Sequence, residues 1–288
     1  MPLHGQFWSA VEPLRAPMMG TELMGPLLYS LVRSLRPRSV VEAGMGYTSP
    51  FIAQALADNL EDFNKEILQI EAKLRSWDER RQILIRQHRE AELNRIHLEC
   101  MISDPALASP SYYCSEYRPT FHAVDKMMSK ETTAPKVLEI LERLGLLKVV
   151  KVHNSDFKSF LDKVDSQCLP FDLIWNDADG LGGVGFKELF ELLNPDGGVL
   201  ILHDTLTTEA GQKIVRAAKQ AQATDMFEDF ELFNLLEPHK MVQTSATLIR
   251  RISGHKPNIF PYSMTGEIEQ EIRRFLEIRT RNRNSSAN

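Results

Sequence analysis

Acidic side chains follow several apolar runs of the sequence, and such groups can bind a cationic or hydroxyl-bearing ligand. Glu42 ends a short β-branched run, and it is followed by Gly44 and Gly46, which let a ligand approach the backbone closely. Four further acids stand in comparable places: Asp125, Asp156, Asp177 and Asp204. This pattern suits the binding of a nucleotide-sized cofactor by carboxylates and by backbone N–H groups.

Alternating strands and helices are needed to bring these acids to one edge. The predicted strands are residues 39–42, 120–125, 147–153, 171–176 and 199–203, with helical patterns between them. This alternation predicts a mainly parallel α/β sheet covered by helices on both faces, which 230–236 and 244–252 would close. Because ligands of such sheets bind beyond the carboxyl ends of the strands, the acids would converge there.

The glycine turn argues against two common nucleotide ligands. Ser49 stands where a dinucleotide fingerprint has its third glycine, and Glu42 would repel a pyrophosphate. The sequence also lacks the Walker A lysine motif of P-loop nucleotidases. Glu42 instead favours a ligand that carries a cationic amino group.

Composition and charge are those of an ordinary globular protein. The 288 residues carry a formal net charge of −5 at pH 7, which argues against nucleic acid as the main partner. No run approaches the ~18 apolar residues of a membrane helix, and residues 1–20 lack a signal-peptide pattern. The three cysteines form no CxxC pair. We therefore expect a cytoplasmic protein that binds neither nucleic acid nor membrane.

The chain is predicted to have three parts. Residues 1–36 form an N-terminal helical segment or lid, and residues 37–262 form the cofactor-binding domain. Residues 263–288 form a C-terminal helix whose polar tail, from Asn282 onward, is expected to be disordered.

A helical insertion is expected within the cofactor-binding domain, at about 59–118. Residues 59–101 contain no glycine and are rich in good helix formers. Apolar residues three and four apart form one seam along this helix: Leu60, Phe63, Ile67, Ile70, Leu74 and Trp77. Packing within the chain and a homodimer contact through 59–101 both explain such a seam.

Two segments resemble class I S-adenosylmethionine (SAM)-dependent methyltransferases. Residues 42–48, Glu-Ala-Gly-Met-Gly-Tyr-Thr, resemble motif I of that superfamily. Residues 194–205, Asn-Pro-Asp-Gly-Gly-Val-Leu-Ile-Leu-His-Asp-Thr, are similar to the late strand of members that act on small molecules. The resemblance covers roughly residues 36–58 and 119–252. It implies a Rossmann-like sheet of seven strands, mostly parallel, with a closing antiparallel strand.

The resemblance also implies how SAM would be held at its methionine and ribose ends. Glu42, Gly44 and Gly46 would line the methionine part, with Glu42 near the amino group. Asp125 would accept hydrogen bonds from both ribose hydroxyls, which is a charge-assisted arrangement.

The adenine and the sulfonium would lie over the next two strand ends. Ser155, Asp156 and Phe157 would face the adenine, and Asp177 would lie beside the sulfonium. For each of these acids the alternative is a helix cap or a surface carboxylate.

Three residues are predicted to serve the chemistry of methyl transfer. His203 has the position and the pKa range of a base that removes a proton from the acceptor, and Asp204 follows it. Tyr113, from the cluster Tyr112, Tyr113 and Tyr117, would place its ring near the sulfonium. Packing of a histidine and of an aromatic loop are the corresponding alternatives.

A metal-dependent reaction is the alternative to a metal-free one. Some O-methyltransferases hold Mg²⁺ with acids that end the fourth and fifth strands, here Asp177 and Asp204, with Asp179 or His203 nearby, and oxygen ligands suit this ion. Thr205 stands where that subgroup often has an amide ligand, which leaves the third ligand open.

The predicted function is SAM-dependent O- or N-methylation of a small metabolite. One alternative is an enzyme that cyclises the aminobutyryl chain of SAM to an azetidine-type amino acid and releases methylthioadenosine. Another alternative is a non-catalytic scaffold that keeps the cofactor-binding fold.

Overall fold

Two compact units make up the chain. The computed structural model describes residues 3–17, 20–103, 105, 110–130, 132–178, 183–224, 229–241, 243–252 and 266–286. The first unit, here called the sheet unit, comprises Met1–Asn59 and Pro119–Lys256. The second, here called the helical unit, comprises Leu60–Arg118 and Pro257–Asn288. The C-terminal helix, predicted as a separate part, belongs to the same unit as residues 60–118.

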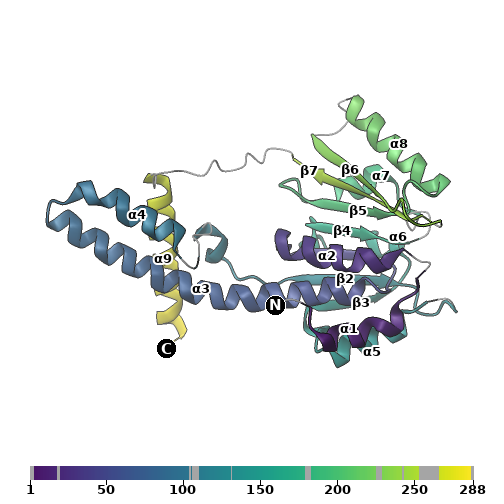
Figure 1. Ribbon diagram of the computed structural model, residues 1–288, viewed down its shortest axis with the longest axis horizontal. Helices are drawn as coiled ribbons and strands as arrows, with labels where there is room; N and C mark the ends of the chain where they lie inside the picture. The colour runs from purple at the N-terminus through teal and green to yellow at the C-terminus, as the bar shows by residue number, and fades with distance from the viewer. Residues whose placement is uncertain are drawn as a thin grey trace. The chain divides into compact units, whose positions relative to one another are not determined.

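A seven-stranded sheet in the order β3-β2-β1-β4-β5-β7-β6 forms the centre of the sheet unit (Figure 1). Neighbouring strands among β1 to β5 are parallel, and β7 is antiparallel to both β5 and β6. The strands are β1 (Ser39–Ala43), β2 (Thr120–Asp125), β3 (Val150–Asn154), β4 (Leu173–Asn176), β5 (Val199–His203), β6 (Phe230–Leu236) and β7 (Ser245–Arg251). The predicted fold class is confirmed.

Helices cover both faces of this sheet. The helices of the sheet unit are α1 (Gly5–Val11), α2 (Thr21–Leu35), the start of α3 (Ser49–Arg86), α5 (Ala134–Arg143), α6 (Phe157–Leu161), α7 (Phe186–Glu191) and α8 (Glu209–Ala223), with 3₁₀ turns at Glu12–Leu14, Leu147–Val149 and Ser166–Cys168. Apolar residues of α6, α7 and α8 pack on one face of the sheet in a single buried cluster with Val41, Ile174 and Leu200. On the other face, α2 approaches α3 closely, since a Cβ at Gly25 would lie 2.8 Å from the Phe51 ring.

The helical unit is built from α3 (from Leu60), a 3₁₀ turn at Glu90–Glu92, α4 (Leu93–Ile102), the 3₁₀ helix η3 (Pro110–Cys114) and α9 (Gly266–Ser286). Its core contains the predicted seam: Phe63, Ile70, Leu74 and Trp77 are buried, and Leu60 and Ile67 pack against them. Partners from α4, η3 and α9 complete this core. The seam is therefore occupied within the chain, so it gives no separate argument for a dimer contact.

Two helices differ from the sequence prediction in length. The run after the glycine turn and the predicted insertion form one continuous helix, α3, of 38 residues. No glycine or proline interrupts residues 51–86, so nothing in the sequence ends the helix earlier. At the C-terminus, α9 continues to Ser286, so residues 282–286, expected to be disordered, are helical.

No described helix combines the length and the apolar character needed to cross a membrane.

A buried histidine pair joins β2 to β3. His122 is buried, and its Nδ1 lies 3.1 Å from Nε2 of His153, with the two rings stacked. Burial, together with the neighbouring His153 and Lys151, lowers the pKa of His122 to about 4. The imidazole is therefore neutral in the folded protein at pH 7.

This pair is expected to make folding sensitive to acid. The unfolded chain takes up a proton at His122 near pH 6.5, whereas the folded chain does so only near pH 4. The stability contributed by the neutral ring is thus complete above pH 6.5 and is lost as the pH falls toward 4, by about 3 kcal/mol. Urea unfolding at pH 7.5 and 4.5 should show a larger loss for the wild type than for His122→Gln. Parallel losses in the two proteins would contradict this expectation.

Candidate functional site

A cavity of about 610 Å³ lies at the carboxyl ends of the parallel strands in the sheet unit. Its lining comes from the segments after β1, β2, β3 and β4 and from the N-terminal segment. The residues are Leu14, Ala16, Thr21, Gly44, Met45, Gly46, Tyr47, Val124, Asp125, Lys126, Ser129, Thr132, Thr133, Ser155, Asp156, Phe157, Asp177 and Ala178. Of the eight residues predicted to bind a cofactor, only Glu42 is absent from this set.

The glycine turn after β1 forms one wall of the cavity. Gly44 has a positive φ of 91°, and a Cβ there would lie 3.4 Å from the backbone oxygen of Asp177. Its N–H donates to the backbone oxygen of Val124 at 2.9 Å, which ties the turn to β2. A glycine is favoured at this position because the positive φ would strain any other residue, and without a Cβ the backbone stays open to a ligand.

Glu42 lies under the turn rather than in the cavity wall. Its carboxyl group is fully buried and accepts hydrogen bonds from the hydroxyls of Thr48, at 2.7 Å, and Ser49. The Thr48 hydroxyl accepts in turn from the indole N–H of Trp175, at 3.1 Å. Burial raises the pKa of Glu42 to about 8, although the two hydroxyl donors act in the opposite direction.

Glu42 is therefore expected to lower the stability of the protein at neutral pH. Its folded pKa near 8 exceeds the unfolded value near 4.5, so its contribution to stability is complete below pH 4.5 and is lost as the pH rises through 8. Glu42→Gln, which carries no charge, should raise the free energy of unfolding by about 4 kcal/mol at pH 8 and by little at pH 4.5. Denaturant titrations at both pH values test this, and destabilisation by Glu42→Gln at pH 8 would contradict it.

Asp125, the last residue of β2, is one of the three acids that line the cavity. Its Oδ2 accepts from the backbone N–H of Met45 at 2.9 Å, and its Oδ1 accepts from the Thr132 hydroxyl at 2.6 Å. Thr133 adds a second link between these segments by donating to the Met45 carbonyl at 2.9 Å. Each carboxylate oxygen can accept two hydrogen bonds and accepts one of these, so each keeps one lone pair for a ligand hydroxyl.

Asp156 caps the short helix α6. Its carboxylate accepts from the backbone N–H of Ser159 at 2.8 Å and from the Ser159 hydroxyl at 2.9 Å. These hydrogen bonds lower the pKa of Asp156. The capping alternative is thus realised for this residue, while Ser155 and Phe157 line the cavity on either side of it.

Asp177 connects the cavity to His203. The Asp177 carboxylate lies 2.6 Å from Nδ1 of His203, and Asp204 lies 3.7 Å from the same nitrogen. The His203 side chain is 7 % exposed, and its buried Nε2 has no hydrogen-bond partner among the described residues. Burial opposes protonation of the ring, but the hydrogen bond and the charge of Asp177, with smaller effects of Asp204 and Glu237, raise the pKa of His203.

The same geometry bears on the magnesium alternative. In the described part of the chain, no three histidine, cysteine or acidic side chains are grouped as metal ligands. The His203 imidazole lies between Asp177 and Asp204, and the hydroxyl of the buried Thr205 is 2.6 Å from that of Thr247. Asp179 lies outside the described residues. These contacts do not fit a magnesium ion held by Asp177 and Asp204.

Tyr113, predicted to serve catalysis, lies in the core of the helical unit. Its ring is buried and stacks on Phe63 with centroids 5.2 Å apart, and its hydroxyl donates to Glu66 at 2.8 Å. Tyr117 is also fully buried in this core. The alternative interpretation of the cluster, aromatic packing, accounts for these contacts.

Several lining residues were not predicted. Thr132 and Thr133 precede α5 and orient the turn through Asp125 and Met45; their only sequence signal is a Thr-Thr pair before a helix. Leu14, Ala16 and Thr21 come from the N-terminal segment, which was expected to be a helical segment or lid. Phe7, in the same segment, packs on Phe51, with ring centroids 4.9 Å apart.

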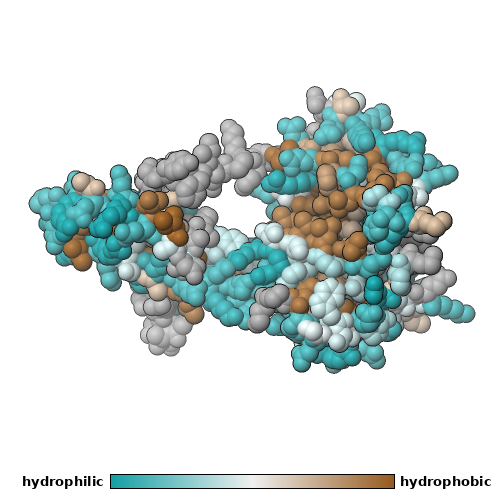
Figure 2. Space-filling model, viewed as in Figure 1, coloured by the Kyte–Doolittle hydropathy of each residue, from teal (hydrophilic) through white to brown (hydrophobic). Residues whose placement is uncertain are grey.

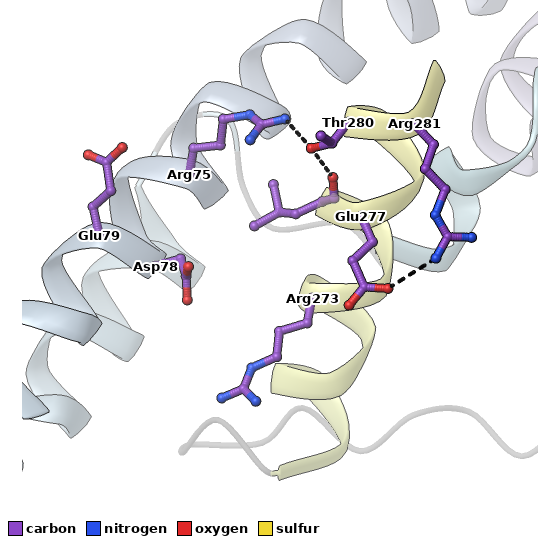
Figure 3. Close-up of a pocket in the computed structure, with 8 residues that line it drawn as sticks. Arg75, Asp78, Glu79, Arg273, Glu277, Thr280 and Arg281 are labelled. Atoms are coloured by element: carbon purple, nitrogen blue, oxygen red, sulfur yellow. Dashed lines mark hydrogen bonds and ion pairs between the residues drawn. The ribbon is translucent and has the colours of Figure 1, made fainter. Parts of the chain in front are cut away.

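A second cavity, of about 510 Å³, lies in the helical unit between α3 and α9 (Figure 3). Its lining includes charged groups of both signs from the two helices: Arg75, Asp78, Glu79, Arg273, Glu277 and Arg281. The neighbouring Glu71 is buried and accepts from Arg75 at 2.8 Å and from Arg279 at 2.9 Å. The Arg279–Glu71 ion pair joins α9 to α3, whereas Arg75 and Glu71 both belong to α3. Because the groove is lined by charges of both signs, it is not matched to one ligand charge.

Comparison with known proteins identifies the fold. No protein-family model and no curated protein matches the sequence. Among solved structures, the chain resembles the O-methyltransferase TomG from Streptomyces achromogenes, which is involved in tomaymycin synthesis and was solved in complex with SAM. The TM-score is 0.52 at 16% sequence identity, covering 86% of this chain and 90% of TomG.

A second solved structure supports the same conclusion. The O-methyltransferase from Bacillus cereus, solved in complex with SAH, gives a TM-score of 0.50 at 14% identity, covering 87% of this chain and 92% of that one. The chain therefore has the fold of the class I SAM-dependent methyltransferases.

Proposed function

We propose that the protein is a SAM-dependent methyltransferase that acts on an oxygen or nitrogen atom of a small molecule. The observation that carries the proposal is the convergence of Gly44, Gly46, Asp125 and Asp177 on one cavity of the sheet unit. The size of this cavity and its three aspartates, against a single lysine, suit a nucleoside cofactor that is cationic at its sulfur and at its amine. Both solved relatives with this fold were crystallised with SAM or SAH.

The residues present fit SAM at its ribose and its sulfonium. Asp125 is fixed by Met45 and Thr132 with a lone pair left on each oxygen, so it can accept from two ribose hydroxyls. Asp177 provides a negative charge in the cavity lining next to Gly44, which suits a cationic sulfur. Because Asp156 already caps α6, Ser155 and Phe157 are the better candidates to contact the adenine.

Glu42 acts in this proposal by holding the turn that contacts the methionine part. Its two hydroxyl partners lie at the start of α3, and the Ser49 hydroxyl also accepts from the Gly46 N–H at 3.0 Å. The carboxyl group therefore fixes the backbone of the turn from below. A cationic amino group above the turn would also favour the ionised form of Glu42.

Proton removal from the acceptor is assigned to His203. Bound SAM supplies a methyl group on a cationic sulfur, and the transfer is an in-line displacement at carbon. Asp177 accepts the hydrogen bond from His203 Nδ1, which leaves Nε2 as the lone-pair nitrogen of the neutral ring. Nε2 takes the acceptor proton, and Asp177 with Asp204 stabilises the imidazolium that results.

Calorimetry with SAM and with SAH tests cofactor binding directly. Incubation with SAM and a panel of small phenols, alcohols and amines, followed by mass analysis of the nucleoside product, tests the reaction. SAH formed only when an acceptor is present supports the proposal. Methylthioadenosine formed without an acceptor would contradict methyl transfer and support cyclisation of the aminobutyryl chain. Failure to bind either ligand would support the non-catalytic scaffold.

A further inference from the structure

Three buried polar atoms, one of them on the proposed base, have no hydrogen-bond partner among the described residues. They are Nε2 of His203, Oε2 of Glu22 and Oε1 of Glu237. The His203 side chain is 7 % exposed, and those of Glu22 and Glu237 are 13 % and 14 % exposed. Buried polar groups are normally hydrogen-bonded, so an unsatisfied one points to a catalytic or ligand-binding role.

The strand register brings His203 and Glu237 to the same face of the sheet. His203 lies opposite Ala246 of β7, which in turn lies opposite Leu235 of β6. Residues in register share a face, and so do alternate residues along one strand, so Glu237 follows Leu235 on the face of His203. The Glu237 N–H donates to the Thr244 carbonyl at 3.1 Å, which continues the pairing of β6 with β7 to this point.

Glu22 reaches the same place from the start of α2. A Cβ at Gly20 would lie 2.0 Å from Cγ2 of Thr244, so the start of the helix lies directly against the residue that leads into β7. Lys240 joins the two acids, with its Nζ 2.5 Å from Oε1 of Glu22 and 3.0 Å from Oε2 of Glu237. One ammonium group therefore bonds one oxygen of each carboxylate, and the second oxygen of each is the unpartnered one.

The charges of this cluster favour a cation. Burial opposes ionisation of Glu237, but hydrogen bonds from Thr244 and Lys240 lower its pKa. Two carboxylates then share one lysine, which leaves a negative charge that His239 offsets only when protonated. Glu237 is also among the carboxylates that raise the pKa of His203 against the effect of burial, so it acts close to the ring.

The unpartnered atoms determine which ligand group fits. Because Asp177 accepts from Nδ1 of His203, Nε2 of the neutral ring carries a lone pair, as do the two free carboxylate oxygens. The group that satisfies them must therefore donate hydrogen bonds. An ammonium group has three N–H donors, no acceptor and one positive charge, so it matches both the three acceptors and the surplus charge.

The cluster adjoins the cofactor cavity. Thr21, the residue before Glu22, lines that cavity. Asp177 lines it as well and bonds to His203. On the other side the half-buried Leu235 borders the cluster, and Figure 2 shows apolar side chains gathered over the strands of the sheet unit beside α2. A polar cluster between the cavity and an apolar surface suits the charged end of a small organic acceptor.

We propose that the acceptor is a small primary amine whose ammonium group is bound by Glu22 and Glu237 and deprotonated by His203. This inference rests on the proposed methyltransferase function and names its substrate class. The ammonium gives a proton to Nε2 of His203, and the nitrogen lone pair that results attacks the methyl carbon of bound SAM. The carbon–sulfur bond breaks with its electron pair left on sulfur, so the products are SAH and an N-methylammonium ion.

Paired acceptors test the substrate class. Primary amines from ethylamine to 2-phenylethylamine, and the alcohols of the same carbon skeletons, are incubated with the wild type and SAM, and the products are identified by mass. We expect SAH together with N-methyl products from the amines, and kcat/KM roughly tenfold or more lower for the alcohols.

Calorimetry with SAM separates the two levels of inference. A protein that does not bind SAM would fail the proposed function itself. A protein that binds SAM but methylates the alcohols in preference, or neither series, would overturn the amine assignment alone.

Glutamine variants test the two carboxylates. Glu22→Gln and Glu237→Gln keep the shape of the side chain, and each should raise KM for the amine with the highest kcat/KM by about 10- to 100-fold, the loss of one charge-assisted hydrogen bond. The dissociation constant for SAM should not change. Glu231→Gln, at an exposed position of β6, is the matched control and should leave KM unchanged.

Far-ultraviolet circular dichroism of the three variants checks that each is folded. An unchanged KM in both Glu22→Gln and Glu237→Gln would mean that ordered water satisfies these oxygens, and it would overturn the proposal. An equal rise of KM in all three variants would overturn it too, because the effect would then not depend on the place of the carboxylate.

Discussion

Asp125→Ala is expected to weaken SAM binding by about 3 kcal/mol or more, which is a loss of roughly 100-fold or more in affinity. The carboxylate is proposed to accept two ribose hydroxyls, and hydrogen bonds to charged groups each contribute about 1.5–3 kcal/mol. Removal of the side chain also frees the Met45 N–H and the Thr132 hydroxyl that it holds. Isothermal titration calorimetry with SAM and SAH measures the effect.

Two controls separate the ribose contact from support of the turn. Thr132→Val removes one hydrogen bond to Asp125 but leaves the carboxylate, so its effect on affinity should be small. A 2′-deoxy form of SAH should bind more weakly than SAH to the wild type, while Asp125→Ala should distinguish the two ligands far less. An unchanged dissociation constant in Asp125→Ala, or an equal penalty for the deoxy ligand in both proteins, would refute the ribose assignment.

His203→Gln is expected to lower kcat by about 10²- to 10⁴-fold with little change in the dissociation constant for SAM. Glutamine retains a hydrogen-bond donor toward Asp177 but cannot take up the acceptor proton. Single-turnover rates with an identified acceptor, together with calorimetry, separate the two quantities. An unchanged kcat in His203→Gln would contradict the assignment of this histidine as the base.

The pH profile offers an independent check of the same assignment. A base must be unprotonated to act, and the pKa of His203 is raised above its usual value near 6.5. The rate should therefore fall as the pH decreases through a value above 6.5. Asp204→Asn removes one of the charges that raise this pKa, so the acid limb should move to lower pH. A limb that stays in place would indicate that another group titrates.

The sheet and most of the cavity were predictable because strand ends of a parallel sheet share one edge. Gly44, Asp125, Asp156 and Asp177 follow four different strands, and the topology alone brings them together. The continuous α3 was also foreseeable, since residues 51–86 contain no helix-breaking residue. The extension of α3 past residue 59 differs from the prediction, in which the insertion at about 59–118 forms an element of its own.

The misplaced side chains depend on contacts that local sequence does not encode. Glu42 does not line the cavity, because its carboxyl group is bonded by two hydroxyls six and seven residues later, one of which also accepts from Trp175. Tyr113 packs on Phe63, 50 positions earlier in the chain, so no spacing rule could have located its ring. For Asp156 the local sequence does contain the signal. An aspartate just before a short helix is a favoured N-cap, and Ser159 is close enough in the chain to donate to it.

Asp177 lines the cavity and also accepts a hydrogen bond from His203. One carboxylate therefore lies next to two groups that can be positively charged, the imidazole and a ligand in the cavity. Under the proposed function, a sulfonium beside Asp177 and a proton on His203 compete for it, and thermodynamic linkage makes this competition reciprocal. Binding of SAM should expel a proton from His203, which leaves the imidazole ready to accept one. Loss of the sulfur's charge on methyl transfer then restores proton affinity. The charge on the cofactor's sulfur would thus determine at which stage of the reaction His203 is able to accept a proton.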